Sequence, residues 1–250
     1  MPSYLITGTS RGLGLAFVTE LLKDPSNTVV ATARNTAGSA GLKELKAQDK
    51  DGRLLLVDLD VSKQESIRAA AEKTAQLLPG GLDHLVSSAG VSSTGVQTFE
   101  EVDLEALMSD LNFTITAPIL LIREFLPLIR DGDHKRILII SSVLGSIQRA
   151  AFTPNLANGY SIARAALNML ARKWSPVLKT EGITLAILHP GWVSSTDIGD
   201  GISEWVAKYA PSLENLTVER SAADCMKVLN GLTVENAGEF FNHDGTDLPF

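Results

Sequence analysis

The stretch Tyr4–Gly14 reads Tyr-Leu-Ile-Thr-Gly-Thr-Ser-Arg-Gly-Leu-Gly, an apolar strand followed by a glycine-rich turn and the start of an apolar helix. Gly8, Gly12 and Gly14 permit a tight turn and let backbone N–H groups approach a pyrophosphate at the helix N-terminus. This order of strand, glycine turn and helix is typical of dinucleotide-binding folds. The alternative interpretation is a tight turn whose glycines serve only helix packing.

Two arginines near this turn indicate which nicotinamide dinucleotide would bind. Folds that prefer NAD place an acid at the end of the second strand, where it binds the ribose 2′-hydroxyl. Here the strand Thr28–Ala33 is followed by Arg34, and Arg11 lies inside the glycine turn. Because a guanidinium binds phosphate in a fork, the two arginines together favour NADP over NAD. Taken alone, each arginine is more often a solvated surface charge.

Short apolar segments alternate with segments of helical period along the chain. The strand-like segments are Tyr4–Thr7, Thr28–Ala33, Leu54–Asp58, His84–Ser87, Ile137–Ser141, Thr184–His189 and Glu239–Asn242. They lack polar alternation, as strands buried on both faces do. The helical segments include Ser62–Leu78, Leu104–Ile129 and Tyr160–Lys179. Ser62 and Glu65 predict a capping box at the first of these helices. We therefore expect one Rossmann-like α/β domain over residues 1–250, a doubly wound parallel sheet of about seven strands with helices on both faces.

Two stretches without clear periodicity, residues 143–159 and 194–217, each follow a predicted strand. Open α/β folds bind ligands beyond the carboxyl ends of their strands, so both stretches are predicted substrate loops. The second stretch carries Ile198, Trp205 and Tyr209, apolar side chains able to close over a ligand. For the first stretch, a plain surface connection is an equal alternative.

Composition and charge exclude several classes of protein. Hydrophobic residues make up 44% and charged residues 20% of the 250 residues, as in ordinary globular proteins. The formal net charge of −7 argues against binding to nucleic acid or to an anionic membrane. Cys225 is the single cysteine, and the histidines are scattered, so neither a disulfide nor a metal site is expected. No apolar run approaches the roughly 20 residues of a membrane span, and the first strand begins near Met1, so we expect a cytoplasmic protein without a signal peptide.

Several further motifs, in their order and spacing, resemble the short-chain dehydrogenase/reductase family. Besides Thr7–Gly14 they are Asp60-Val61, Ser87-Ser88-Ala89-Gly90, Asn112, Ser141-Ser142, Tyr160 with a cation four residues on, and Pro190-Gly191. Residues 141–147 and 240–250 are similar to the carbonyl-reductase-like branch, which includes fungal ketoreductases of the norsolorinic acid type. The resemblance extends from Thr7 nearly to Phe250.

The resemblance implies an NADPH-dependent reductase of a ketone or aldehyde in a mostly apolar metabolite, working as a homodimer. Tyr160 would protonate the carbonyl oxygen while NADPH delivers hydride to the carbon, and Ser142 would hydrogen-bond the same oxygen. Asn112 would anchor a water that links the site to solvent. A free phenol has a pKa of about 10, so a cation is needed nearby. The residues implied in cofactor binding are Gly8, Ser10, Arg11, Gly12, Leu13, Gly14, Arg34, Asp60, Val61, Ser88, Ala89, Gly90, Pro190, Gly191, Val193 and Thr196.

The main departure from the family pattern Tyr-x-x-x-Lys is Arg164, which stands in place of the lysine. Four residues along a helix place it on the face of Tyr160, where a cation 4 Å away contributes roughly 4 kcal/mol. A guanidinium does not release its proton, so proton relay at this position should be lost or rerouted. Two alternatives therefore stay open: an NADP(H)-binding protein without turnover, and an enzyme that performs a non-redox step such as a cyclisation.

Two smaller departures concern the turns around the predicted site. Ser87 and Ser88 replace the usual pair of asparagines, and because serine reaches less far, we expect a looser turn. The interval of 18 residues from Ser142 to Tyr160 is longer than in most family members. This interval should enlarge the loop beside the substrate.

Overall fold

The computed structural model describes residues 1–90 and 99–250, and the strands of these residues form one parallel sheet. The strands are β1 (Ser3–Thr7), β2 (Thr28–Ala33), β3 (Leu54–Asp58), β4 (His84–Ser87), β5 (Arg136–Ile140), β6 (Thr184–His189) and β7 (Phe240–Asn242). Their order is β3-β2-β1-β4-β5-β6-β7, with every neighbouring pair parallel. The predicted doubly wound α/β fold is confirmed. Strand bounds agree with the sequence prediction to within one residue, because the interior of each strand is mostly apolar.

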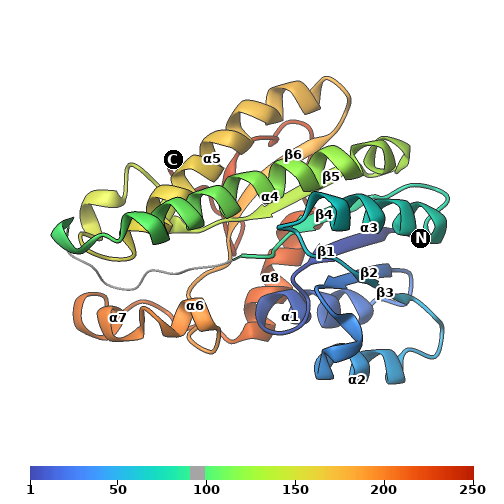
Figure 1. Ribbon diagram of the computed structural model, residues 1–250, viewed down its shortest axis with the longest axis horizontal. Helices are drawn as coiled ribbons and strands as arrows, with labels where there is room; N and C mark the ends of the chain where they lie inside the picture. Colours follow the sequence, from blue (N-terminus) through green and yellow to red (C-terminus); the bar gives the residue numbers. More distant parts are fainter. Residues whose placement is uncertain (91–98) are drawn as a thin grey trace.

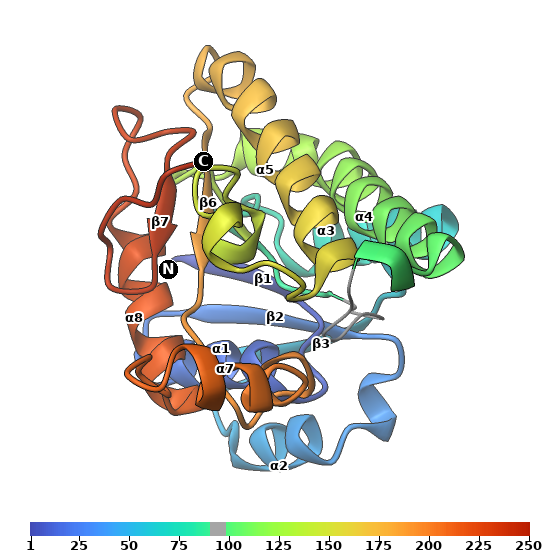
Figure 2. The same ribbon diagram turned by 90° about the vertical axis from the view of Figure 1, so that its left-hand side faces the viewer.

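Helices cover both faces of the sheet (Figure 1, Figure 2). One face carries α3 (Gln64–Leu77), α4 (Leu104–Asp131) and α5 (Asn158–Lys179), and the other carries α1 (Gly12–Leu22), α2 (Ala40–Gln48) and α8 (Val218–Asn230). Each layer buries its own apolar cluster against the sheet. Leu121 and Phe125 of α4 belong to the first cluster, and Phe17 of α1 with Met226 of α8 belongs to the second. Helices packed on both faces fix where the carboxyl ends of the strands emerge.

The start of α3 differs from the sequence prediction. The helix begins at Gln64 after Lys63, which makes no side-chain cap, so the predicted capping box of Ser62 and Glu65 is wrong. The Ser62 hydroxyl instead donates to Oδ1 of Asp60 at 2.6 Å, and the Ser62 N–H donates to the same oxygen at 3.1 Å. This local turn competes with capping for the serine side chain.

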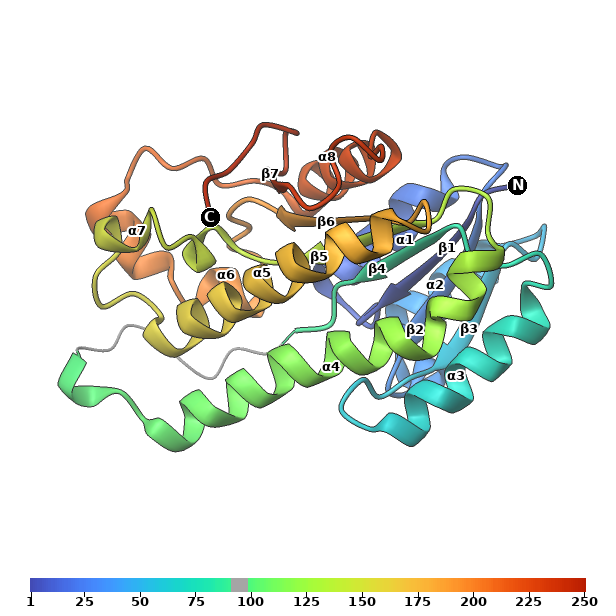
Figure 3. The ribbon, with the colours of Figure 1, turned by 90° about the horizontal axis from the view of Figure 1, so that it is seen from above.

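The helix α4 differs from the expectation that no apolar run approaches the length of a membrane span. Its 28 residues include an 18-residue window with a mean hydropathy of 1.4, so by length and composition it could span a membrane, contrary to the expectation from the sequence. In the fold, however, α4 lies along α3 and α5 and packs on the sheet (Figure 3). Part of this helix is therefore buried in the core: 39% of that window is buried, while Leu104 and Met108 stay exposed.

The chain beyond β5 and β6 contains more regular structure than the sequence predicted. The first predicted loop contains short 3₁₀ turns at Val143–Gly145 and Ala150–Phe152, and the second contains α6 (Asp197–Asp200) and α7 (Ser203–Tyr209). The hydroxyl of Thr196 caps α6 by accepting the N–H of Gly199 at 3.1 Å. The helix α7 lies at the end of the molecule away from the N-terminus (Figure 3).

Candidate active site

A cavity of about 980 Å³ lies at the carboxyl ends of the strands. The cavity runs from the glycine turn to α5 and α7. Its volume is within the usual range for sites that hold small molecules. The predicted site residues that line it are Gly8, Ser10, Arg11, Gly12, Leu13, Gly14, Arg34, Asp60, Val61, Ser88, Ala89, Gly90, Ser142, Tyr160, Arg164, Pro190, Gly191, Val193 and Thr196. The fold thus brings the predicted cofactor residues and the predicted catalytic residues to one cavity, with the exception of Asn112.

Close contact between two backbone turns shapes the cofactor end of this cavity. Gly8 has a φ of +76°, and a Cβ at this position would lie 2.9 Å from Cα of Ala89. The buried hydroxyl of Thr7 accepts the backbone N–H groups of Ser88 and Ala89, each at 3.0 Å. Thr7 therefore anchors the turn after β4 through its backbone, so the serines at this turn do not leave it loose. The sequence placed Thr7 at the end of a strand and at the start of the Thr7–Gly14 motif, but did not show this contact.

A cluster of charges lies where β2 and β3 end. Arg34 is exposed and close to Asp60. A hydrogen bond from the Ser62 hydroxyl, aided by the nearby charges of Lys63 and Arg34, holds the pKa of Asp60 below its usual range. Asp60 is therefore ionised at neutral pH, while Arg34 keeps its guanidinium at the rim of the cavity.

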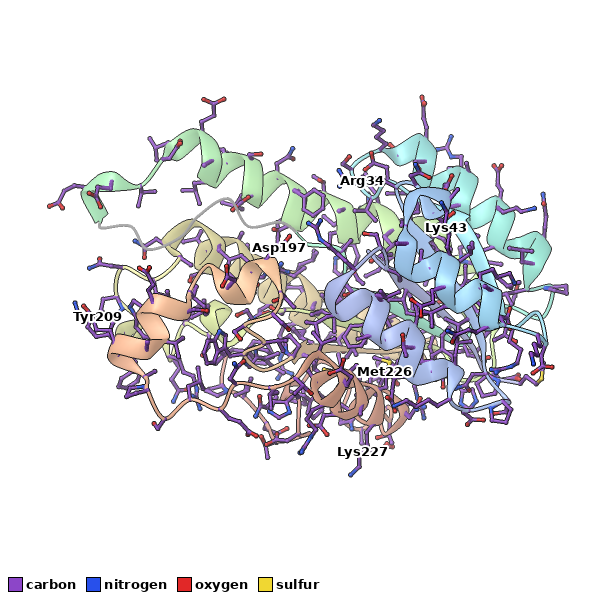
Figure 4. The ribbon with its side chains drawn as sticks, turned by 90° about the horizontal axis from the view of Figure 1, so that it is seen from below. Arg34, Lys43, Asp197, Tyr209, Met226 and Lys227 are labelled. Carbon is purple, nitrogen blue, oxygen red and sulfur yellow. The ribbon has the colours of Figure 1, made fainter. Side chains whose placement is uncertain are left out.

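Arg11 lines the same cavity as Arg34, but its guanidinium is paired with a carboxylate. Its Nη2 forms an ion pair with Oδ2 of Asp197 at 2.5 Å, and both side chains are exposed. Asp197 is the first residue of α6, so this ion pair joins the glycine turn to the segment between β6 and α7. Figure 4 shows Arg34, Asp197 and Tyr209 following one another along the same side of the molecule, from the cofactor end toward α7. Any contact of Arg11 with a bound phosphate must compete with Asp197.

Tyr160 and Arg164 form the buried centre of the cavity. They are 7% and 6% exposed, and the guanidinium carbon of Arg164 lies 4.7 Å from the centroid of the Tyr160 ring. Nη1 of Arg164 donates to the carbonyl oxygen of Ile140 at 3.2 Å, at the end of β5. The four-residue spacing thus places the cation over the phenol ring, a favourable cation–π arrangement that is strengthened by burial. Ser142 follows the same strand and is also buried, with its Oγ accepting the Leu144 N–H at 3.2 Å.

The position assigned to Asn112 needs a correction. Asn112 is exposed on α4 and is not among the described residues that line the large cavity. Thr114 is two residues further along, roughly 200° around the helix, and is only 5% exposed. Thr114 lines a second, small cavity together with Arg164. The phase of the helix therefore brings Thr114 rather than Asn112 toward the site.

Asn168 is a buried polar residue that the sequence analysis missed. Its Oδ1 accepts the hydroxyl of Ser141 at 2.6 Å, and its Nδ2 donates to the carbonyl oxygen of Gly145 at 3.2 Å. It lies four residues beyond Arg164, on the same face of α5. Asn168 thus fixes the turn that carries Ser142, and a polar residue on the buried face of this helix was the available signal.

The other end of the cavity is apolar. Leu156 and Tyr160 pack with Ile202 and Trp205, and the rings of Trp205 and Tyr209 lie 5.3 Å apart. Phe152 also lines the cavity, although it is 79% exposed. This wall of aliphatic and aromatic side chains suits an apolar ligand.

His189, the last residue of β6, also lines the cavity. Burial lowers its pKa to about 3, and the nearby positive charges of His243 and Arg149 act in the same direction. The ring is therefore neutral at physiological pH and does not carry the proton that an acid catalyst would need.

Comparisons with known proteins agree with this geometry. The sequence pattern of the family described as short chain dehydrogenase matches residues 3–207. An uncharacterized oxidoreductase of Schizosaccharomyces pombe is 34% identical over 255 residues, which cover 99% of this chain and 97% of that protein. A short-chain dehydrogenase/reductase of Arthrinium sp. is 34% identical over 267 residues, which cover 98% of each chain. The crystal structure of the NADPH-bound carbonyl reductase from chicken fatty liver has a TM-score of 0.85 and 32% identity, covering 100% of this chain and 99% of that one. The chain therefore belongs to the short-chain dehydrogenase/reductase family, as the motifs had predicted, and is similar to its fungal and carbonyl-reductase members.

Proposed function

We propose that this chain is an NADPH-dependent oxidoreductase that reduces a ketone or aldehyde of a mostly apolar metabolite. The observation that carries this proposal is a single cavity that joins the glycine turn and Arg34 to Ser142 and Tyr160. The carbonyl reductase from chicken fatty liver, which is similar over the whole chain, was solved with NADPH bound.

The residues present fit NADPH. The glycine turn presents backbone N–H groups at the start of α1, and the missing side chain of Gly8 leaves the turn in contact with Ala89. Arg34 offers an exposed guanidinium directly after β2, where an enzyme that prefers NAD would carry an acid. Asp60 and Val61 would lie at the adenine, and Pro190, Gly191, Val193 and Thr196 would lie around the nicotinamide and pyrophosphate.

The catalytic step would rest on Tyr160 and Ser142. When bound, the reduced nicotinamide supplies a hydride to the carbonyl carbon. The Tyr160 hydroxyl would give its proton to the carbonyl oxygen, which completes the alcohol, and Ser142 would hold that oxygen in place by a hydrogen bond. Arg164 packs its guanidinium over the Tyr160 ring and would hold that ring in place for the proton transfer.

The substrate would enter between residues 143–159 and 194–217. Their side chains around Tyr160 are apolar and aromatic, including Phe152, Trp205 and Tyr209. Burial of these side chains against a ligand would exclude water from the reacting carbonyl. A substrate with a flat or aliphatic body and one carbonyl group fits this wall best.

A panel of aromatic, alicyclic and aliphatic ketones and aldehydes tests the proposal. We expect purified protein to consume NADPH with at least one apolar carbonyl compound and to form the alcohol in equal amount. Calorimetric titration with NADPH should run in parallel. NADPH binding without turnover over the whole panel would contradict the reductase and favour a binding protein. Product formation without NADPH consumption would favour the non-redox alternative.

The assembly and location of the protein are part of the same proposal. The helices α4 and α5 carry exposed apolar side chains, among them Met108, Ile162, Met169 and Val177. Such side chains on neighbouring helices support a homodimer through this face. Sedimentation velocity should then show a dimer, and a monomer over the whole accessible concentration range would contradict it. The cytoplasmic location stays a prediction from the sequence.

A further inference from the structure

The guanidinium of Arg164 is enclosed by its neighbours. The ring of Tyr160 lies on one face at 4.7 Å, and the carbonyl oxygen of Ile140 accepts Nη1 at 3.2 Å. The backbone of Gly90 approaches it as well, since a Cβ added there would lie 2.9 Å from Nη2. A methyl group at position 90 would therefore require the end of the Arg164 side chain to shift.

The Nε of Arg164 is buried and has no hydrogen-bond partner among the protein atoms described. Arg164 also lines a second cavity of about 10 Å³, enclosed by α4, α5, β5 and the turn after β4. Ser87 and Thr114 give this cavity polar groups. A cavity of this size and polarity has room for about one water molecule, and a buried guanidinium N–H is costly to leave without an acceptor.

We propose that Thr114 and Gly90 are positioning residues that fit the site to the arginine at position 164. Gly90 leaves room for the planar group, and Thr114 holds one water in the small cavity, which accepts the Nε–H of Arg164. The guanidinium plane is thereby fixed against Tyr160. This inference rests on the proposed function for its activity readouts, but not for its binding and stability readouts.

The consequence is that the arginine belongs to a matched set. Lysine has one flexible ammonium group and no planar fork. It would therefore leave the space beside Gly90 empty, and it would have no Nε–H to donate to a water in the small cavity. We therefore expect Arg164→Lys to lower carbonyl reduction rather than raise it. A large gain in turnover from this substitution would overturn the proposal, because it would mean that the surroundings still suit lysine.

The hydroxyl of Thr114 can be tested with matched variants. Thr114→Val keeps the shape and removes the hydroxyl, Thr114→Ser keeps the hydroxyl, and Thr116→Val removes an exposed hydroxyl that bonds only the carbonyl oxygen of Asn112, at 2.6 Å. We expect Thr114→Val to lower kcat about tenfold and to displace the pH profile of kcat, with KM for NADPH unchanged. Thr114→Ser should retain most of the wild-type kcat, and Thr116→Val should retain all of it. Equal kinetics and pH profiles for Thr114→Val and Thr116→Val would refute the role of Thr114.

The fit between Gly90 and Arg164 can be tested without any turnover. Gly90 also lines the cofactor cavity, so a double-mutant cycle of Gly90→Ala and Arg164→Lys is needed to isolate the coupling between the two residues. We expect Gly90→Ala to weaken NADPH binding about fivefold more in the wild-type background than in the Arg164→Lys background. Gly90→Ala should likewise lower Tm more in the wild-type background than in the Arg164→Lys background. Additive effects on both quantities would overturn the proposed fit.

A high-resolution crystal structure should show a water between Thr114 and Nε of Arg164, and a dry cavity would refute that part of the proposal.

These measurements separate the inference from the proposed function. If the wild-type protein reduces no carbonyl compound, the proposed function fails, while the cycle in NADPH affinity and Tm still decides on Gly90 and Arg164. If the wild-type protein is an active reductase and the cycle is additive, the function stands and the fit of Gly90 to the guanidinium fails.

Discussion

The two ends of the large cavity are built from different parts of the chain. At the cofactor end, main chain meets main chain: Gly8 approaches Ala89 so closely that a Cβ would lie 2.9 Å away, and the Thr7 hydroxyl binds two backbone N–H groups. At the substrate end, side chains from distant segments meet, and some remain exposed, such as Phe152 at 79% and Tyr209 at 60%. The first end is defined by backbone geometry and the second by the shapes of side chains.

This difference shows which part of the site can adapt. A turn held by backbone contacts offers the same groups to every ligand, so it suits a cofactor that does not vary. Exposed aromatic side chains on short helices can repack around different ligands at little cost to the sheet. The proposed chemistry lies at the junction, where Tyr160 and Arg164 of α5 reach the strand ends.

The largest expected effect separates the two ends through Tyr160. Tyr160→Phe removes only the hydroxyl, so it should lower kcat about 10²- to 10⁴-fold, the usual range for loss of a general acid. NADPH affinity should stay within about twofold, because the backbone turns at the cofactor end are untouched. Steady-state kinetics and calorimetric titration measure the two quantities. Retention of most of the activity would assign the proton donor to another group.

The second prediction changes only the cofactor end. Arg34→Asp removes a guanidinium expected to bind the 2′-phosphate and adds a repelling charge, so NADPH should bind about 100-fold more weakly while NADH binding is unchanged or improved. Arg123→Asp, an equal change of charge at an exposed position of α4, is the control and should leave both affinities alone. Equal wild-type affinities for NADH and NADPH would contradict the role assigned to Arg34.

A third prediction concerns the sheet that joins the two ends. Burial lowers the pKa of His84 to about 3, with Arg136 and His134 adding to the shift. The unfolded chain takes up this proton near its ordinary pKa of about 6.5 and the folded chain does not, so the unfolded state binds more protons and stability falls as the pH drops below 6.5. The free energy of unfolding should decrease by about 2 kcal/mol between pH 7 and pH 5 from this residue alone.

Urea denaturation at the two pH values measures this loss. The variant His84→Gln lacks the titrating group at this position, while His189, whose pKa burial also lowers to about 3, remains in both proteins. The variant should therefore show a smaller dependence on pH than the wild type, even if its stability at pH 7 is lower. If the wild type and His84→Gln lost stability equally between pH 7 and pH 5, acid sensitivity would have to come from other groups.

The contrast between the two ends also explains how far the sequence could predict the structure. Strands buried on both faces are mostly apolar, so all seven were predicted to within one residue. The glycine turn was recognised because close backbone contact excludes side chains at fixed positions, as at Gly8. Most of the cofactor residues followed from these two constraints and from the family resemblance.

The errors fall where side-chain direction decides. Asn112 and Thr114 are two residues apart, and only the packing of α4 shows which of them faces the site. Ser62 satisfied a capping pattern, but a local turn with Asp60 uses its hydroxyl instead. The partner of Arg11 lies 186 residues away in the chain, and no local pattern could have predicted that contact.

The last prediction is the smallest and tests this distant contact. Arg11 and Asp197 form an ion pair at 2.5 Å with side chains 78% and 75% exposed, and both line the cavity. Exposed ion pairs contribute about 0.2–1 kcal/mol, so release of Arg11 by Asp197→Asn should strengthen NADPH binding about 1.5- to 5-fold. NADH has no 2′-phosphate for Arg11 to reach, so its affinity should not change. The gain should shrink with added salt, since exposed charges are screened.

Glu204→Gln on α7, which also removes one exposed negative charge, controls for net charge. If Asp197→Asn strengthened the binding of both dinucleotides equally, or weakened NADPH, Asp197 would serve the start of α6 rather than compete for Arg11.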